Sequence, residues 1–346
     1  MSELGISLPC PGTTLLNALL ALGILLAPWI QLRAAEKADK PKGQVKVWKK
    51  HHEAAMEALK GNDYATGKLE LEAALAEARA IKTNDFHVAT SLDDLGRLHQ
   101  DMRNWREAIE LFRQGAAVQA SKWGTNHATV AYFQQRLGFC LAMNKQYAEA
   151  EEVQLACRKL LGMRYGAFHP RVGEVLNGLG ITYTAEGKYP EAQEALTSAL
   201  KILTSEQTYS EIDTSGVPQT YVYTPSPSTY AHVYHNLAML YAQQRKFEES
   251  DKAYEECLAK VRSGRGAKAA LQIPTLNNWA LGLLQRKAPA EAESKLKVAL
   301  ACLEKNKGPD LPYLKDTLRL LVIACSQQGK NEEATSYKEK LAGLEK

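Results

Sequence analysis

Hydrophobic and polar positions follow a helical period through most of the chain, and the pattern itself recurs about every 42 residues. An aromatic side chain marks the recurrence at Trp105, Tyr147 and Tyr189, each 42 residues after the last. The equivalent positions elsewhere are Tyr64, Phe247, Pro289 and Asn331. Seven units are therefore in phase. A period of this length is typical of stacked supersecondary units that bury one continuous core.

Small residues recur at three fixed distances from this marker position. Six of the seven units have Gly or Ala nine positions before it, all seven have Gly, Ala or Ser three positions after it, and six have Ala, Gly or Cys ten positions after it. The three sets are Ala55, Gly96, Gly138, Gly180, Ala238, Ala280 and Val322; Gly67, Ala108, Ala150, Ala192, Ser250, Ala292 and Ala334; and Ala74, Gly115, Cys157, Ala199, Cys257, Ala299 and Leu341. Because small side chains let helices approach closely, the sequence predicts interlocking helical hairpins that stack on one another.

The periodicity predicts seven helix pairs. They are 45–60 with 63–81, 87–102 with 105–121, 127–143 with 147–162, 170–186 with 189–204, 230–244 with 247–262, 269–286 with 289–305, and 311–328 with 331–344. Elsewhere the sequence has no β-rich segment.

An insert of about 16 residues separates the fourth pair from the fifth, within 205–229, because the marker spacing grows there from 42 to 58. It contains Tyr209, Tyr221, Tyr223, Pro218, Pro225 and Pro227. Prolines interrupt helices, so we expect a loop. Two interpretations stay open: a tyrosine-bearing lid or partner contact, and a tolerated surface insertion.

The units resemble the tetratricopeptide repeat (TPR). The segments that carry the resemblance are Leu179–Tyr183 with Gly187–Ala192, and Leu237–Tyr241 with Arg245–Ser250. The 42-residue spacing and the segments between repeats at 86–89, 126–131 and 168–172 are similar to those of the kinesin light chain subtype. The resemblance spans roughly residues 45–344 and implies an all-α fold, a right-handed alpha-solenoid of about seven hairpins. A TPR solenoid is thus expected over 45–346.

The resemblance also implies where a ligand would bind. In this family the first helix of each hairpin lines a concave groove, and asparagines at its fifth and sixth positions hydrogen-bond a peptide main chain. An amide suits that task because it offers both a donor and an acceptor. The residues expected to bind peptide are Asp94, Arg97, Arg136, Asn177, Asn236, Gln243, Asn277, Asn278 and Gln285. The competing interpretation is a solvated polar helix face.

The formal net charge of +4 is local. Residues 36–50 contain six lysines against Glu36 and Asp39, whereas residues 1–35 sum to zero, so the repeat region is formally neutral. Phosphate binding needs clustered Lys and Arg. We therefore expect no nucleic-acid partner.

The first 35 residues are predicted to be a signal peptide or a membrane anchor, followed by a basic linker at 36–44. Leu15–Ala27 is a mostly apolar run closed by Pro28, a length that favours a cleaved export signal and thus a periplasmic or extracellular protein. The absence of Lys or Arg before the run, and the lysines after it, disagree with that interpretation. Extended to residues 13–30, the run becomes long enough for membrane association through an uncleaved anchor.

No residue pattern predicts catalysis, a cofactor or a metal site. His232 and His235 share a helical face but lack a third ligand at a recognisable spacing. His87, His127 and His169 recur with the repeat, in matching turns between hairpins, which indicates a structural role. The cysteines, Cys157 and Cys257 included, are expected to be buried free thiols.

The sequence therefore predicts a non-catalytic scaffold that binds a protein or peptide ligand along its groove. The alternative is a structural protein that self-associates through its array ends. That alternative depends on Leu341 and Leu344 in the C-terminal helix, which has no following cap.

Overall fold

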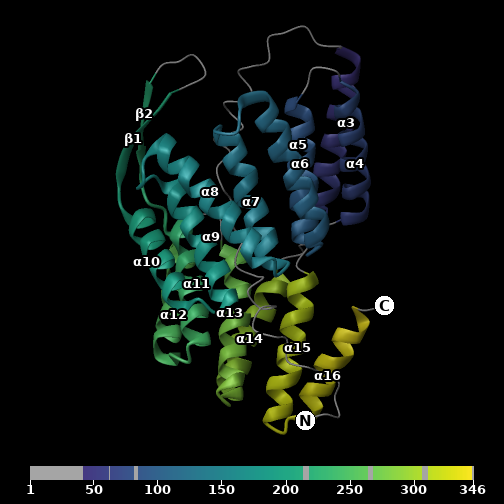
Figure 1. Cartoon of the computed structure of the whole chain (residues 1–346). Coiled ribbons are helices and arrows are strands. Elements are labelled where there is room, and N and C mark those ends of the chain that lie inside the picture. The colour runs from purple at the N-terminus through teal and green to yellow at the C-terminus, as the bar shows by residue number, and fades with distance from the viewer. Residues whose placement is uncertain are drawn as a thin grey trace. The chain divides into compact units, whose positions relative to one another are not determined.

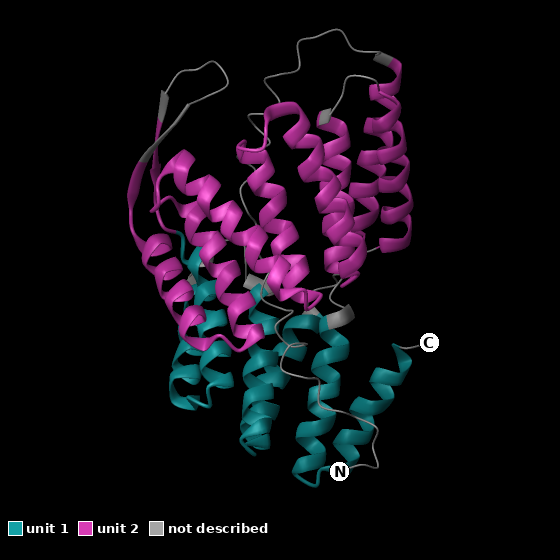
Figure 2. Ribbon diagram, in the orientation of Figure 1, with its two compact units in different colours: residues 1–23, 226–346 teal, residues 24–225 magenta. Residues whose placement is uncertain are grey.

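The structure is a computed structural model that describes residues 42–61, 63–81, 85–212, 218–263, 268–305 and 311–344. These residues form 14 helices and two strands (Figure 1). The described parts fall into two compact units, one within residues 42–225 and one within 226–344 (Figure 2). Each unit consists of stacked helical hairpins, as the all-α solenoid prediction requires.

Four hairpins form the first unit. They are α3 (Lys42–Lys60) with α4 (Tyr64–Ala80), α5 (Asp85–Asp101) with α6 (Trp105–Trp123), α7 (Ala128–Met143) with α8 (Tyr147–Tyr165), and α9 (Pro170–Glu186) with α10 (Tyr189–Thr204). Three hairpins form the second unit: α11 (Pro227–Gln243) with α12 (Phe247–Ser263), α13 (Lys268–Gln285) with α14 (Pro289–Lys305), and α15 (Leu311–Gln327) with α16 (Asn331–Gly343). All boundaries lie within three residues of the predicted ones.

The small-residue register forms the core, as predicted. Every residue three positions after the marker is buried, and so are six of the seven in each of the other two sets. The backbones are so close at these positions that a Cβ added to Gly180 would lie 2.4 Å from Leu196 Cγ. The exceptions, Val322 and Leu341, are half-buried in the last hairpin, which has no hairpin after it among the described residues.

The turn inside each hairpin is conformationally uniform. The residue two positions before the marker has a positive φ in six hairpins, for example 63° at Lys145 and 86° at Gly187. At each of these turns the backbone N–H of the residue after the positive-φ residue donates to a carbonyl in the last turn of the preceding helix. An example is the bond from Gln146 N to Leu141 O at 2.9 Å. This pattern satisfies carbonyls that the helix end would leave unpaired. Only two of the six residues are glycine; the other four are Arg or Lys.

The periodic histidines do have structural roles. His127 and His169 are the N-cap residues of α7 and α9, and their Nδ1 atoms accept from Thr129 N and Arg171 N. Each ring also stacks on the aromatic residue that ends the preceding hairpin. The prediction that His87 occupies a matching turn was wrong, because His87 is buried in the first turn of α5 with its ring edge against Trp48.

The insert was incorrectly predicted to be a loop. Strands β1 (Gln207–Ile212) and β2 (Pro218–Tyr223) pair antiparallel, with Tyr209 opposite Tyr221. β-branched and aromatic residues dominate β2, and Pro218 is its first residue, the place where a missing N–H is tolerated. Two side-chain contacts tie the base of this hairpin to α10: Gln207 Nε2 donates to Ile202 O at 2.9 Å, and Tyr223 Oη donates to Leu203 O at 3.0 Å.

The predicted signal peptide or anchor at residues 1–35 lies outside the described residues, as does most of the basic linker. Residues 42–44 of that linker belong to α3. Among the described helices, none combines the length and apolarity needed to cross a membrane.

Candidate functional site

The first helices of successive hairpins lie side by side, and they carry the predicted ligand-binding positions. In the second unit α11 contacts α13, and α13 contacts α15; in the first unit α7 contacts α9. We call the α11, α13 and α15 layer the amide face. The layer formed by α5, α7 and α9 we call the charged face.

Paired tyrosine, carboxylate and guanidinium groups occupy the charged face. The Tyr132 hydroxyl lies 3.0 Å from both carboxylate oxygens of Asp93. Arg136 Nη2 donates to that hydroxyl at 3.5 Å, and its guanidinium lies over the Tyr132 ring. Burial raises the pKa of Asp93 to about 6, against the opposing effect of Arg136. Asp93 thus hydrogen-bonds Tyr132, and the charge of Arg136 acts on its carboxylate within a largely desolvated cluster.

Two more carboxyl groups on this face are also desolvated. Burial raises the pKa of Asp101 to about 6 and that of Glu174 to about 7. Arg97 and Arg136 counteract the rise at Asp101. The predicted residue Asp94 is already engaged, because His52 Nε2 lies 2.9 Å from its Oδ2. The charged face therefore holds mutually compensating charges of both signs.

On the amide face, the same kind of hydrogen bond links each first helix to the next. His235 Nδ1 lies 2.9 Å from Thr275 Oγ1, and one repeat later Asn277 Oδ1 lies 3.0 Å from Thr317 Oγ1. In a third contact, Asn278 Nδ2 lies 3.1 Å from His235 Nε2. All of these side chains are buried. Polar side chains thus connect α11, α13 and α15.

Two neighbouring side chains of α13 each have a buried polar atom without a hydrogen-bond partner. The two atoms are Asn277 Nδ2 and Asn278 Oδ1, in side chains 2% and 5% exposed. Such orphans are rare in folded proteins, because each loses its hydration without compensation. Both belong to residues that the sequence predicted to bind peptide.

The other predicted residues differ in exposure. Asn177 and Asn236 are buried, Arg136 and Gln243 are half-buried, and Arg97 and Gln285 are exposed. The structure brings Asp94, Arg97 and Arg136 together around Asp93, and it brings Asn277 and Asn278 together around His235. Sequence reasoning placed His235 at a groove position, but it did not single out Tyr132 and Thr275, which hydrogen-bond Asp93 and His235. A signal was available for Thr275 and His235, since they lie 40 residues apart at neighbouring positions of the repeat.

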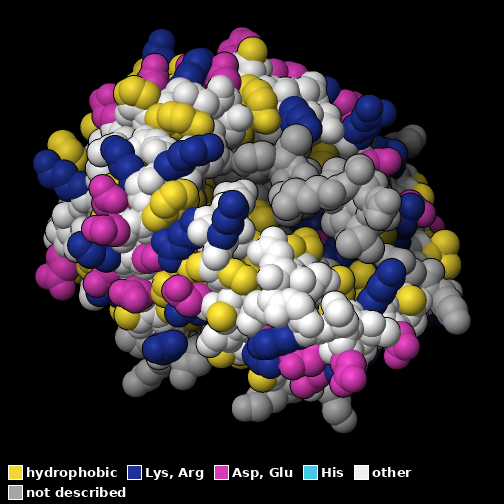
Figure 3. All heavy atoms as spheres, turned by 90° about the horizontal axis from the view of Figure 1, so that it is seen from below, with side chains coloured by type: hydrophobic (Ala, Val, Ile, Leu, Met, Phe, Trp, Pro, Cys, Tyr) yellow, Lys and Arg dark blue, Asp and Glu magenta, His cyan; other side chains and the backbone are white. Residues whose placement is uncertain are grey.

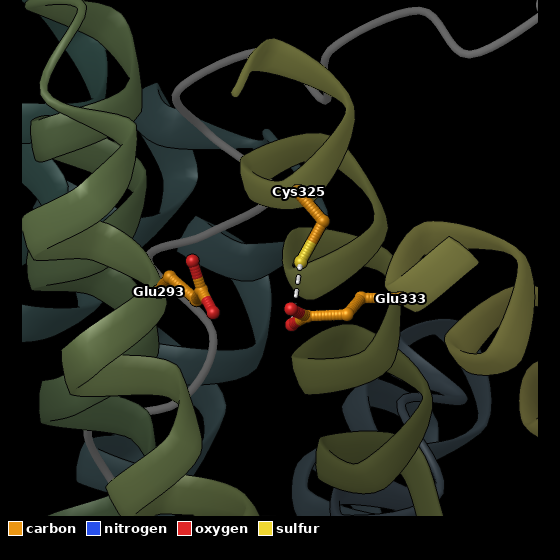
Figure 4. Close-up of side chains that lie close together, drawn as sticks. All are labelled: Glu293, Cys325 and Glu333. Atoms are coloured by element: carbon orange, nitrogen blue, oxygen red, sulfur yellow. Dashed lines mark hydrogen bonds between the residues drawn. The ribbon is translucent and has the colours of Figure 1, made fainter. Parts of the chain in front are cut away.

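Both ring nitrogens of His235 are engaged, so a metal bound there would displace Thr275 and Asn278. Among the described residues, ligand atoms cluster instead at Glu293 of α14, Cys325 of α15 and Glu333 of α16 (Figure 4). Glu293 already binds Lys297 Nζ at 2.5 Å and Lys330 Nζ at 2.6 Å. A metal would have to replace both ammonium groups.

The Glu293 cluster follows the repeat register, which indicates a structural role. An acidic residue four positions after the marker pairs with a basic residue in the next hairpin's turn region three times: Glu151 with Lys188, Asp251 with Arg286, and Glu293 with Lys330. The two lysines and Gln328 lower the pKa of Glu293 to about 2. This recurring ion pair holds adjacent hairpins together.

The described surface in Figure 3 mixes Lys and Arg side chains with Asp and Glu. A nucleic-acid interface would instead show a stripe of positive charge. Large apolar side chains that are strongly exposed include Met163, Phe168 and Val222, whereas Leu341 and Leu344 are half-buried. Self-association through Leu341 and Leu344 stays a prediction.

Family profiles described as tetratricopeptide repeat match residues 127–205, and residues 88–128 and 231–263. No curated protein matches the chain. Among solved structures, the chain is similar to Rap protein complexed with Competence and Sporulation Factor (10% identity, covering 92% of this chain and 79% of that one, TM-score 0.56). It is also similar to the apo form of RapI (11% identity, 86% and 97% covered, TM-score 0.55).

A third similar structure holds the kinesin light chain nearly identical TPR-like repeats of Podosopora anserina, at 22% identity, with 63% of this chain and 96% of that one covered. Its TM-score is 0.42.

Stacked hairpins with an ion-paired register and a polar layer of first helices define a helical-repeat protein of the kind that serves as a protein-interaction scaffold. The matched profiles and the hairpin geometry agree on the type of repeat. Residues 88–205 and 231–263 of the chain are tetratricopeptide repeats.

Proposed function

We propose that this protein is a non-catalytic scaffold that binds an extended protein or peptide segment on the first-helix layers of its hairpins. The observation that carries the proposal is the pair of orphan atoms on adjacent residues of α13, Asn277 Nδ2 and Asn278 Oδ1. A peptide main chain presents a carbonyl and an N–H in alternation, and these match a donor beside an acceptor.

The fold adds support for binding without catalysis. Rap protein, which shares the fold, is complexed with Competence and Sporulation Factor in its structure. Rigid helices that carry many modest contacts also lower the entropy cost of binding, because the surface is already ordered. The charged face of the first unit is a second binding surface, at which the Arg97 side chain is exposed.

Selection from a randomised dodecapeptide display library against the immobilised full chain tests the proposal. We expect recovered peptides to bind in the micromolar range, and Asn236→Ala with Asn278→Ala to weaken binding at least tenfold. The matched control is Gln114→Ala, an exposed amide on α6 outside both faces. Equal loss in the control, or no enriched peptide at all, would refute the proposal.

A further inference from the structure

The amide face contains a chain of hydrogen bonds that starts at a backbone carbonyl. Thr275 Oγ1 lies 2.6 Å from Leu271 O, and a carbonyl can only accept. This contact is the shortest of the three that Thr275 Oγ1 makes, the others being to His235 Nδ1 at 2.9 Å and Cys257 Sγ at 3.5 Å, so we assign the single hydroxyl proton to Leu271 O. Thr275 Oγ1 is then left with lone pairs for its next neighbour, His235 Nδ1 at 2.9 Å.

This commitment determines the tautomer of His235. A neutral imidazole carries its proton on one nitrogen only, and Nδ1 must donate if Thr275 accepts. Nε2 is then an acceptor for Asn278 Nδ2, 3.1 Å away. His235 is fully buried, and burial lowers its pKa to about 3, so the ring is neutral at physiological pH.

The orientation of the Asn278 amide follows from the tautomer. Its NH2 group faces two acceptors, His235 Nε2 and, at 3.4 Å, Met239 Sδ. Turning the amide over would place its oxygen against both. Oδ1 therefore points away from both acceptors, and it is the atom that has no partner.

Asn277 is held less strictly. Thr317 Oγ1 lies 3.0 Å from Asn277 Oδ1 and 2.8 Å from Tyr313 O. One hydroxyl proton cannot serve both acceptors. In the structure Thr317 donates to Asn277 Oδ1, which leaves Nδ2 as the free donor, but donation of the Thr317 proton to Tyr313 O instead would allow this amide to turn over. Of the two neighbouring amides, only Asn278 has a fixed polarity.

The two helices that carry His235 and Asn278, α11 and α13, have almost no charge, whereas α15, which contacts α13, contains Lys315, Asp316 and Arg319. The sequence of α11 contains no Lys, Arg, Asp or Glu, and that of α13 contains only Lys268, at its first position. A charged ligand group buried against Asn278 would lose its hydration and find no ionic partner on α11 or α13. The charged face of the first unit differs in this respect.

We propose that His235, held in its Nδ1–H form by Thr275, is a positioning residue that fixes Asn278 Oδ1 as an acceptor for an N–H group of an uncharged ligand segment. The proposal rests on the proposed function for its ligand. Its tautomer and orientation can be tested without any ligand.

The first experiment records long-range proton–nitrogen correlations of the imidazoles in the full chain, with histidine labelled by nitrogen-15. His235→Gln identifies the signals by their loss. We expect Nδ1 protonated and Nε2 unprotonated, with no change between pH 8 and pH 5. A protonated Nε2, or titration within that range, would overturn the proposal.

Two variants separate positioning from packing. Thr275→Val removes the acceptor for Nδ1–H and should shift His235 towards its other tautomer. Thr184→Val is the matched control, because Thr184 is also buried and also donates to the carbonyl four residues earlier, Gly180 O at 2.7 Å, in the other unit. An unchanged His235 spectrum in Thr275→Val would show that Thr275 does not determine the tautomer of His235.

The second experiment tests whether the hydrogen bond from Asn278 to His235 affects ligand binding. The probe is the tightest dodecapeptide recovered from the display library, methylated at one backbone nitrogen at a time. One methylation should weaken binding to the native chain about tenfold, the cost of one hydrogen bond. His235→Leu should cause a similar loss, and the two losses together should not add. His235→Gln retains an acceptor and should partly restore affinity.

Additive losses, or native affinity in His235→Leu with unchanged helicity, would overturn the proposal while leaving the proposed function intact. Recovered peptides rich in charged residues would overturn the uncharged-ligand part of it. Failure to recover any peptide would refute the proposed function. The tautomer measurement would still show whether Thr275 and His235 fix the orientation of Asn278.

Discussion

Replacing Gly115 by alanine tests whether the small-residue register determines how the hairpins interlock. Gly115 lies mid-way along α6, where alanine would normally favour the helix by about 1 kcal/mol. Here, however, the added Cβ would lie 2.1 Å from Phe133 Cε1 of α7. Ordinary carbon contacts are about 3.5–4.0 Å, so the buried ring must move by more than 1 Å.

Overpacking of this kind costs about 1–3 kcal/mol, and the extreme closeness favours the upper end of that range. After subtraction of the helix preference, Gly115→Ala should lower the free energy of unfolding by about 2 kcal/mol. Gly162→Ala is the matched control: it lies in α8 of the same unit, and nothing is within 4 Å of its added Cβ. That change should raise stability by up to about 1 kcal/mol.

Urea denaturation followed by far-ultraviolet circular dichroism measures both variants against the native chain, with fitting that allows the two units to unfold separately. Because the helix preference is common to both variants, their difference isolates the packing cost. Equal stabilisation by the two substitutions would show that the Phe133 ring does not pack closely on the α6 backbone at Gly115, and the interlocking of α6 with α7 would be refuted.

Two further substitutions test the turn and the ion pair. Lys145→Gly should raise stability by about 0.5–1 kcal/mol, since Lys145 has a φ of 63° that glycine adopts without strain. Lys159→Gly, at an exposed position of helix α8, should instead lower stability by about 1 kcal/mol, and the same sign for both would contradict the turn assignment. Glu293→Gln should lower the free energy of unfolding by about 2 kcal/mol at pH 7. Because the folded-state pKa of Glu293 is lowered to about 2, this loss should be complete above pH 5 and should shrink as the pH falls towards 2. A loss that is the same in denaturation at pH 7, 5 and 3 would show that the pairing with Lys297 and Lys330 is not electrostatic.

The hairpins were predictable because packing at a fixed period leaves a fixed trace in the sequence. The close approach at Gly180 and Gly115 requires a residue without a bulky side chain, and the same need recurs in every unit. The last hairpin has no hairpin after it among the described residues, so small residues are not required at every register position there. Val322 and Leu341 therefore depart from the small-residue pattern. The insert was mispredicted because proline excludes a helix but does not distinguish a loop from a short strand that begins at Pro218.

The candidate site was only partly predictable. Family resemblance indicated Asn277 and Asn278, yet it could not show that His235 would occupy both the Thr275 hydroxyl and the Asn278 amide. Hydrogen-bond polarity depends on which proton goes to which acceptor in three dimensions. Likewise, the high pKa of Glu174 follows from burial, which one residue in a helical pattern does not reveal.

Hydrogen–deuterium exchange of the full chain, with and without a display-selected dodecapeptide, tests the central claim most directly. A ligand on the amide face should slow exchange in α11, α13 and α15, because bound segments protect the helices they cover. The second helices of the same hairpins, α12, α14 and α16, should exchange as before. Protection confined to those second helices would contradict the account, and it would place the binding surface on the opposite layer of the hairpins.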